Sequence, residues 1–272
     1  MKKIEIEELK RLQIEILNAV HDSCIKNNID YWLDSGTLLG AIRHKGYIPW
    51  DDDIDIGMLR SAYEKFREVF NLENERYKFV CAEDNDEYCY AYGKVLDTYT
   101  VLYEPDRLGR KLAVNIDIIV YDNAPNDDKE VTRMYRIRDF YRGCNVARTQ
   151  KNDVMPGLKR KIAFKILNVL LHPFPQNYFA RKMSENAQKL KDQNTKRVGN
   201  FTCYAAFACE KTVFDSFIEH EFEGNQYMIP VGYDKWLKAM YGEYMRLPPE
   251  EKRVSTHTFE AYWLCDRVLE TS

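Results

Sequence analysis

Four aspartates fall within five positions of the sequence, at Asp51, Asp52, Asp53 and Asp55, and isoleucines alternate with the last two. If Asp53-Ile54-Asp55-Ile56 is an extended strand, its two carboxylates share one face and its two isoleucines share the other. Asp51 joins the carboxylate face if that strand begins early. Carboxylates on one partly buried face repel each other, and a hard divalent cation that prefers oxygen ligands relieves the repulsion. The spacing indicates a Mg²⁺ or Mn²⁺ site, against the alternative of a solvated acidic turn.

A turn of small residues, Ser35-Gly36-Thr37, precedes the acidic cluster. Residues 37–44 are expected to be helical, with Ser35 or Thr37 capping the first turn. The free backbone N–H groups at the start of a helix suit a phosphate. The turn and the aspartates together predict that a phosphate site and a metal site are built from neighbouring elements.

The elements that must position these residues alternate between strands and helices. Apolar residues recur at helical spacing in residues 7–26, which predicts a packing helix, and in residues 60–70, where Tyr63, Phe66 and Phe70 are expected to point inward. The other helices are expected at 127–148, at 158–171 and up to about residue 193. Strands are expected at 29–33, 77–80, 88–96, 100–103 and 112–121, and extended segments at 200–208 and 221–229.

Composition excludes several classes of protein. The chain has 272 residues, of which 45% are hydrophobic and 13% aromatic, so a folded core is expected rather than disorder. A net charge of −3 argues against bulk nucleic-acid binding. The seven cysteines are scattered without a C-x-x-C pair, which favours reduced thiols in the cytoplasm over zinc or disulfides. Residues 1–8 contain no apolar stretch, so no secretory signal is expected, and no apolar run is long enough to span a bilayer.

The block from Leu33 to Met58 resembles a known family. The glycine turn followed by paired aspartates looks like the signature of the nucleotidyltransferase superfamily. More narrowly, Leu38-Leu39-Gly40-Ala41-x-Arg43 and Pro49-Trp50-Asp51-Asp52-Asp53 resemble the LicD family, whose bacterial members transfer phosphocholine from CDP-choline to cell-surface glycans. Fukutin and fukutin-related protein, which transfer ribitol phosphate from CDP-ribitol, are similar in this block. The stretch from Met240 to Pro249 is similar to a second block of the family, whereas residues 125–200 match weakly.

The superfamily pattern implies a third aspartate from a later strand, and Asp117 is the candidate. It is the only charged residue in the apolar run 112–121. An unpaired carboxylate there would be destabilising, so we expect Asp117 to reach the metal. A buried aspartate that pairs with an arginine or caps a turn is the alternative.

The resemblance also implies a mechanism and further binding residues. Two divalent ions held by Asp53, Asp55 and Asp117 would bridge the pyrophosphate of a CDP-linked donor, and Asp117 would help to deprotonate an acceptor hydroxyl. The phosphates would meet the Ser35-Gly36-Thr37 turn, together with Arg43, His44, Lys94 and Arg253. Lys94 has the alternative reading of a snorkelling surface lysine. Trp50 and the tyrosines would surround a choline group by cation–π contact, although core packing is the alternative for them.

We therefore expect a mixed α/β enzyme with a nucleotidyltransferase-like core at 28–125. Residues 1–27 would pack on this core, and a mostly helical region at 126–272 would complete the cleft. The expected reaction moves a phospho-substituent, phosphocholine first among the candidates, to a hydroxyl of a teichoic acid, lipopolysaccharide or capsule precursor and releases CMP. Two alternatives stay open: a nucleotidyltransferase that moves NMP from an NTP, and a nucleotide-binding module without catalysis.

Residues 158–171 combine basic and apolar side chains. Lys159, Arg160, Lys161 and Lys165 lie among isoleucine, leucine, valine and phenylalanine residues. This composition is typical of a helix at a membrane interface, although ordinary core packing is the alternative. An acceptor built on a lipid carrier would lie at such a surface, so peripheral membrane contact is one expectation.

Overall fold

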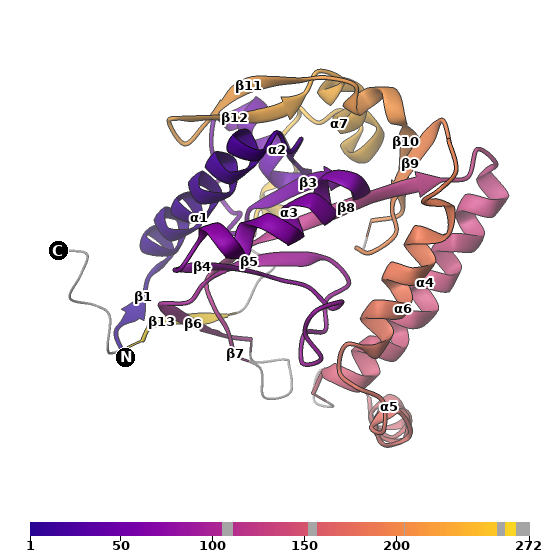
Figure 1. The fold of residues 1–272 in the computed structure, drawn as a ribbon. Helices are drawn as coiled ribbons and strands as arrows, with labels where there is room; N and C mark the ends of the chain where they lie inside the picture. The colour runs from indigo at the N-terminus through magenta and orange to yellow at the C-terminus, as the bar shows by residue number, and fades with distance from the viewer. Residues whose placement is uncertain (105–110, 152–156, 204, 255–258, 265–272) are drawn as a thin grey trace.

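The computed structural model describes residues 1–272 except 105–110, 152–156, 204, 255–258 and 265–272. It consists of a central mixed sheet with helices packed against it, a small second sheet, and a two-stranded hairpin (Figure 1). The expected mixed α/β class is confirmed.

The central sheet is organised around one long strand, β8. On one side β8 pairs with β3 in parallel, and on the other it pairs antiparallel with β5 through its first half and with β9 through its second half. Residues 116 and 118–121 of β8 are buried, as expected for a strand covered on both faces. The strands of this sheet are β2 (Trp32–Leu33), β3 (Asp55–Leu59), β4 (Tyr77–Val80), β5 (Gly93–Asp97), β8 (Asn115–Ala124), β9 (Arg197–Asn200) and β10 (Phe207–Glu210).

A second sheet joins segments that lie far apart in the sequence. Its order is β1-β13-β6-β7, and every described pairing is antiparallel. The strands are β1 (Lys3–Ile4), β6 (Thr100–Tyr103), β7 (Lys111–Leu112) and β13 (Glu260–Trp263), and a separate hairpin contains β11 (Phe217–Phe222) and β12 (Asn225–Pro230). The first strand of the chain is therefore bonded to the last described strand.

The helices cover the central sheet and extend beyond it. Helices α1 (Ile6–Asn27) and α3 (Arg60–Glu73) contact each other and both contact β8, so they lie on one face. Tyr63, Phe66 and Phe70 of α3 are buried as expected. Helix α2 (Ser35–His44) contacts β2 and β3, whereas α4 (Asp128–Thr149) and α6 (Tyr178–Ala187) pack side by side beyond β9 (Figure 1). The remaining helices are α5 (Leu158–Leu171) and α7 (Tyr233–Tyr241), with 3-10 turns at Gln188–Leu190, Lys211–Phe214 and Glu250–Lys252.

Two expected strands are shorter than predicted. The strand expected at 88–96 begins only at Gly93. Before it, side chains satisfy backbone groups that a strand would otherwise use: the Tyr88 hydroxyl donates to the Tyr92 carbonyl at 2.9 Å, and Asn145 Nδ2 donates to the Cys89 carbonyl at 2.8 Å. The strand expected at 29–33 is likewise only Trp32–Leu33.

The acidic segment also enters its strand later than predicted. Strand β3 begins at Asp55, so Asp53 precedes it. Asp51 does not join the strand, because its N–H donates to the Ile48 carbonyl at 2.8 Å in a turn. The expected alternation still holds, since Ile54 and Ile56 are fully buried.

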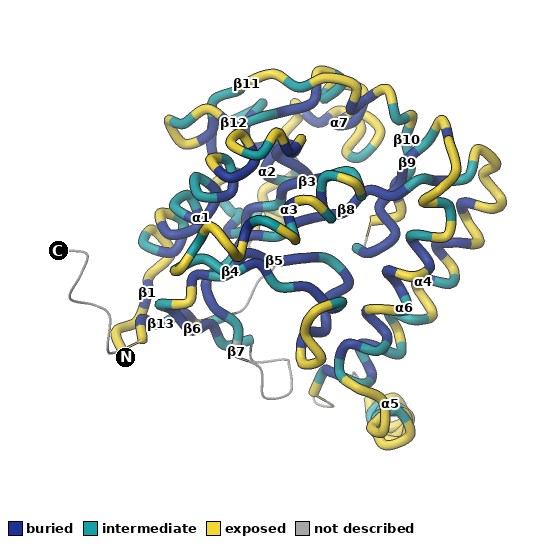
Figure 2. Tube along the Cα trace, viewed as in Figure 1, coloured by how far each residue is buried: buried dark blue, intermediate teal, exposed yellow. Residues whose placement is uncertain are grey.

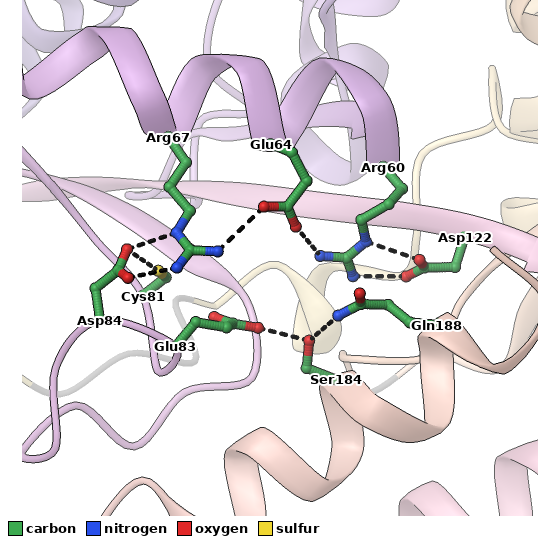
Figure 3. A network of polar contacts seen from close by, with 9 residues as sticks. All are labelled: Arg60, Glu64, Arg67, Cys81, Glu83, Asp84, Asp122, Ser184 and Gln188. Atoms are coloured by element: carbon green, nitrogen blue, oxygen red, sulfur yellow. Dashed lines mark hydrogen bonds and ion pairs between the residues drawn. The ribbon is translucent and has the colours of Figure 1, made fainter. Parts of the chain in front are cut away.

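Polar contacts join α3 to β8 and α6 to the segment before β5 (Figure 3). Arg60 of α3 forms two hydrogen bonds of 2.8 Å with the buried carboxylate of Asp122 on β8. Ser184 of α6 donates to Glu83 at 2.6 Å. Strands β9 and β10, which lie beyond residue 125, extend the central sheet next to β8.

Candidate active site

Three charged residues lie side by side on three adjacent strands. In the parallel pairing of β3 with β8, Asp55 is opposite Asp117, and in the antiparallel pairing of β5 with β8, Lys94 is opposite Asp117. Lys94 Nζ forms an ion pair with Asp117 Oδ1 and donates to Asn115 Oδ1 at 2.9 Å. Lys94 is 7% exposed, so the reading of a snorkelling surface lysine is wrong. Asp117, whose side chain is 17% exposed, is thus paired with a lysine rather than an arginine.

The start of helix α2 positions Asp55 through its backbone. The Asp55 N–H donates to Thr37 Oγ1 at 2.9 Å, and the Asp55 carbonyl accepts from the Asp34 N–H at 2.9 Å. Ser35 adopts a left-handed backbone conformation with φ of 47°. A side chain on Gly36 would place its Cβ 2.8 Å from Asp51 Oδ2, so the absence of a side chain at Gly36 leaves room for that carboxylate. The Ser35-Gly36-Thr37 turn therefore lies directly against the acidic cluster.

Electrostatic repulsion is built into this cluster. The pKa of Asp55 is raised well above its usual range, first by burial and then by the negative charges of Asp53 and Asp117. Asp34 raises it further and Lys94 opposes the effect. Lys94 therefore offsets only part of the combined effect of burial and these carboxylates on the pKa of Asp55.

Asp34 is a buried carboxylate that the sequence analysis missed. Burial raises its pKa to about 6, although hydrogen bonds to the carboxylate act in the opposite direction. The Tyr121 hydroxyl donates to Asp34 Oδ2 at 2.9 Å, and Trp32 Nε1 donates to Oδ1 at 3.4 Å. Its place before Ser35-Gly36-Thr37 was a visible signal for a helix N-cap, but its burial follows from the tertiary structure.

A cavity of about 490 Å³ opens beside the carboxylates. Asp53, Asp117 and Lys94 line it together with Tyr90 and Tyr92. Lys94 Nζ lies 5.0 Å from the centroid of the Tyr90 ring and 5.4 Å from that of Tyr92. The other lining residues are Gln13, Asp52, Ile54, Leu102, Glu104, Leu112, Asn115 and Phe259. Helix α1 thus contributes Gln13 to the site, in addition to the packing expected of it.

The donor set is suited to a divalent cation. Asp53, Asp55 and Asp117 offer carboxylate oxygens, which Mg²⁺ and Mn²⁺ prefer, and the raised pKa of Asp55 shows that added positive charge would relieve repulsion. In the described ranges, no three acidic, histidine or cysteine side chains are already arranged to enclose a metal ion. Asp117 instead turns toward Lys94, so its role as a ligand stays a prediction.

Four more of the predicted residues gather around a second cavity, of about 630 Å³. Arg43, Trp50 and Arg253 line this cavity, and His44 adjoins it. Arg43 Nη1 donates to the Tyr244 carbonyl at 2.8 Å, and its Nε donates to His44 Nε2 at 3.0 Å. Burial and the charge of Arg43 lower the pKa of His44, which keeps Nε2 available as an acceptor. The Arg253 guanidinium lies 5.8 Å from the centroid of the Trp50 ring.

Tyr241 belongs to the second cavity, and the sequence analysis missed it. It lines the cavity with Arg43. Its pKa is raised, first by burial of the hydroxyl and then by the negative charges of Asp34 and Asp55, although 42% of the residue is exposed. The predicted residues thus form two neighbouring groups, one acidic and one rich in arginine.

Comparison with known proteins agrees with this arrangement. A family model described as LicD/FKTN/FKRP, nucleotidyltransferase domain, matches residues 28–140, which contain β3, β5, β8 and α2. The lipopolysaccharide cholinephosphotransferase LicD of Haemophilus influenzae is 34% identical over 272 residues, covering 97% of this chain and 100% of that protein. An uncharacterized protein of Rickettsia typhi, RT0683, is 30% identical over 52% of this chain and 42% of its own length. Human ribitol 5-phosphate transferase FKRP is 40% identical over 53 residues, which are 20% of this chain and 9% of that protein.

The matched domain is a nucleotidyltransferase domain in the wording of the family description. The chain belongs to the LicD family, because the similarity to the Haemophilus protein extends over nearly its whole length.

Proposed function

We propose that this protein transfers phosphocholine from CDP-choline to a hydroxyl of a cell-surface glycan and releases CMP. The observation that carries the proposal is that Asp53, Asp117 and Lys94 line one cavity, and that Asp55 lies opposite Asp117 on the neighbouring strand. The full-length similarity to a lipopolysaccharide cholinephosphotransferase supports phosphocholine as the group and a glycan such as lipopolysaccharide as the acceptor. A teichoic acid or capsule precursor offers the same hydroxyl chemistry.

Asp53, Asp55 and Asp117 would hold Mg²⁺ or Mn²⁺. When bound, the metal neutralises phosphoryl charge and polarises the phosphorus centre. Thr37 holds the backbone of Asp55 in place, and Lys94 holds the carboxylate of Asp117. In the transfer, a bond forms between the acceptor oxygen and the choline-bearing phosphorus as the bond from that phosphorus to the CMP oxygen breaks. Asp117 accepts the proton of the acceptor hydroxyl, because it lines the cavity from β8, whereas Asp53 and Asp55 come from β3 and the segment just before it.

The two cavities suit the two halves of such a donor. Arg43 and Arg253 would bind the phosphate of the departing CMP, and the Trp50 ring offers a face for the cytosine base. Ser35 and Gly36 would contribute backbone N–H groups to the pyrophosphate. On the acidic side, Tyr90 and Tyr92 would face the quaternary ammonium of choline, since aromatic faces and carboxylates attract cations.

Product analysis tests the proposal. The purified protein is incubated with Mg²⁺, CDP-choline and choline-free lipopolysaccharide, and the nucleotides are separated by chromatography. We expect CMP, choline covalently attached to the glycan, and loss of both products with EDTA. Pyrophosphate released from CTP, with CMP attached to the acceptor, would instead identify an NMP transferase. Absence of turnover with every CDP conjugate would leave a nucleotide-binding module.

A further inference from the structure

Helix α5 lies at the edge of the molecule and touches it along a narrow stripe (Figures 1 and 2). The partly buried residues of α5 are Lys161, Phe164, Asn168 and Leu171, which are spaced three and four positions apart. Asn168 Nδ2 donates to the Ala147 carbonyl of α4 at 2.7 Å. This stripe attaches α5 to α4 and leaves the rest of the helix surface uncovered.

The uncovered face is strongly apolar. No residue of α5 is buried, so the alternative of ordinary core packing for residues 158–171 is wrong. Ile162, Ile166 and Val169 are 52%, 57% and 65% exposed, and Leu158 and Leu170 are 74% and 66% exposed. At 100° per residue these five positions share one side of the helix, opposite much of the attachment stripe. A contiguous apolar face of this kind indicates an interaction surface.

The charge of the helix identifies the partner. Lys159, Arg160, Lys161 and Lys165 give α5 four positive charges, and the helix contains no aspartate or glutamate. The protein as a whole carries a charge of −3, so this basic helix is a local feature. A second copy of α5 would bring like charges together, whereas an anionic lipid surface supplies both negative headgroups and an apolar interior.

We propose that α5 binds the surface of an anionic lipid bilayer. Leu158, Ile162, Ile166, Val169 and Leu170 insert at the boundary between headgroups and acyl chains, while the basic side chains meet lipid phosphates. The helix lies in the plane of the surface, since no helix of the described residues is long and apolar enough to cross a bilayer. Attachment through α5 would hold the enzyme where a lipid-linked glycan acceptor is presented.

Vesicle flotation tests this inference without using the enzymatic reaction. The full-length protein is mixed at low salt with vesicles of phosphatidylcholine alone or with one third phosphatidylglycerol. We expect flotation with the anionic vesicles only, and its loss at high salt. The I162D/I166D double variant should bind at least tenfold more weakly. The K159Q/R160Q variant should also bind at least tenfold more weakly, since each basic residue near such a surface contributes on the order of fivefold.

Matched variants separate the role of α5 from general effects. Leu72 is 85% exposed on α3, and L72D should leave vesicle binding unchanged. Lys191 and Lys196 are exposed and lie outside α5. K191Q/K196Q removes two positive charges, as K159Q/R160Q does, and should leave vesicle binding unchanged. Flotation that persists in I162D/I166D would overturn the inference, as would equal binding to neutral vesicles. A wild-type dimer that I162D/I166D converts to a monomer would overturn it by showing that a second copy covers α5.

Discussion

Among single residues, Asp55 is a proposed metal ligand whose buried negative charge also destabilises the fold. Its raised pKa reflects burial and the neighbouring charges of Asp53 and Asp117, so ionised Asp55 destabilises the metal-free protein. We therefore expect D55N to lower turnover of CDP-choline at least 100-fold while raising the melting temperature in EDTA. D53N should lower turnover to a similar extent. Turnover is measured as CMP release and stability by thermal unfolding, with exposed Asp215 as D215N control.

The opposite pair of results would contradict this assignment. If D55N kept near-wild-type turnover, Asp55 would not be a ligand. If D55N unfolded at lower temperature than the wild type in EDTA, the repulsion inferred from the cluster would be absent.

Asp34 should make stability depend on pH. Its pKa of about 6 in the folded protein exceeds the ordinary value of 3.8, so folding favours the protonated form. Well below the ordinary pKa the group is protonated in both states and the stability does not depend on its titration. Between the two pKa values it is ionised in the unfolded chain but protonated in the folded protein, so stability falls as the pH rises, by up to about 3 kcal/mol, and the loss is complete above pH 6. Relative to D34N, the wild type should therefore lose stability between pH 4 and pH 7, as measured by denaturant unfolding. A pH-independent difference between the two proteins would show that Asp34 does not titrate in this range.

Between elements, a largely buried ion pair joins α3 to β8 in addition to their apolar packing. Asp122 has a side chain that is 1% exposed, and Arg60 is its bidentate partner. Replacing Arg60 by methionine leaves a buried carboxylate unpaired, which should lower the free energy of unfolding by about 3–5 kcal/mol. Arg67 is a matched control on the same helix, because its partner Asp84 is 53% exposed and R67M should change stability by less than about 1 kcal/mol. Equal effects of R60M and R67M would contradict this account.

Elements with a strong local pattern were predictable, and those fixed by distant partners were not. The helix expected at 158–171 and the strands at 77–80 and 100–103 have the predicted bounds, because periodicity and breakers mark them locally. The pairing of β1 with β13 joins two short segments from distant parts of the chain. Neither segment has a sequence pattern that predicts its pairing partner. The start of β5 was misplaced because the side chain of Asn145, on α4, bonds to the segment before it.

The same distinction applies to the candidate site. Alternation with isoleucines made Asp53 and Asp55 candidates, and the superfamily pattern together with an apolar run made Asp117 one. The structure places Asp55 and Asp117 on neighbouring strands. The structure also explains why the Leu38-Leu39-Gly40-Ala41 motif contains a glycine. A Cβ on Gly40 would lie 2.5 Å from the Gly46 carbonyl oxygen, so only glycine lets α2 approach the segment before the aspartates. The partners of Lys94 and the position of Tyr241 depend on strand register and on α7, which a linear pattern does not encode.

For the molecule as a whole, the two cavities predict how ligand and metal act together. Suppose that the arginine-rich cavity binds the CMP half of the donor and that the carboxylates bind Mg²⁺. Mg²⁺ then neutralises the carboxylates that would repel the donor phosphates, and the phosphates neutralise the arginines that would repel Mg²⁺. CDP-choline with Mg²⁺ should then raise the melting temperature more than the sum of their separate effects. At 100 times the dissociation constant, a ligand stabilises by about 2.7 kcal/mol. For a chain of this size that corresponds to roughly 5–11 °C.

A thermal-shift series with CDP-choline, CDP-ribitol, CDP-glycerol, CTP and CMP, each with and without Mg²⁺, measures this coupling. Two variants separate the cavities. D53N should abolish the effect of Mg²⁺ but retain a shift with CMP, whereas R253Q should weaken the shift with every cytidine nucleotide alike. A CDP conjugate that exceeds CMP identifies the head group, because the nucleotide half is common to all of them. A shift with CTP alone would favour NMP transfer. A response to CMP that is lost in D53N and kept in R253Q would place the nucleotide at the carboxylates and refute the division of the site into two cavities.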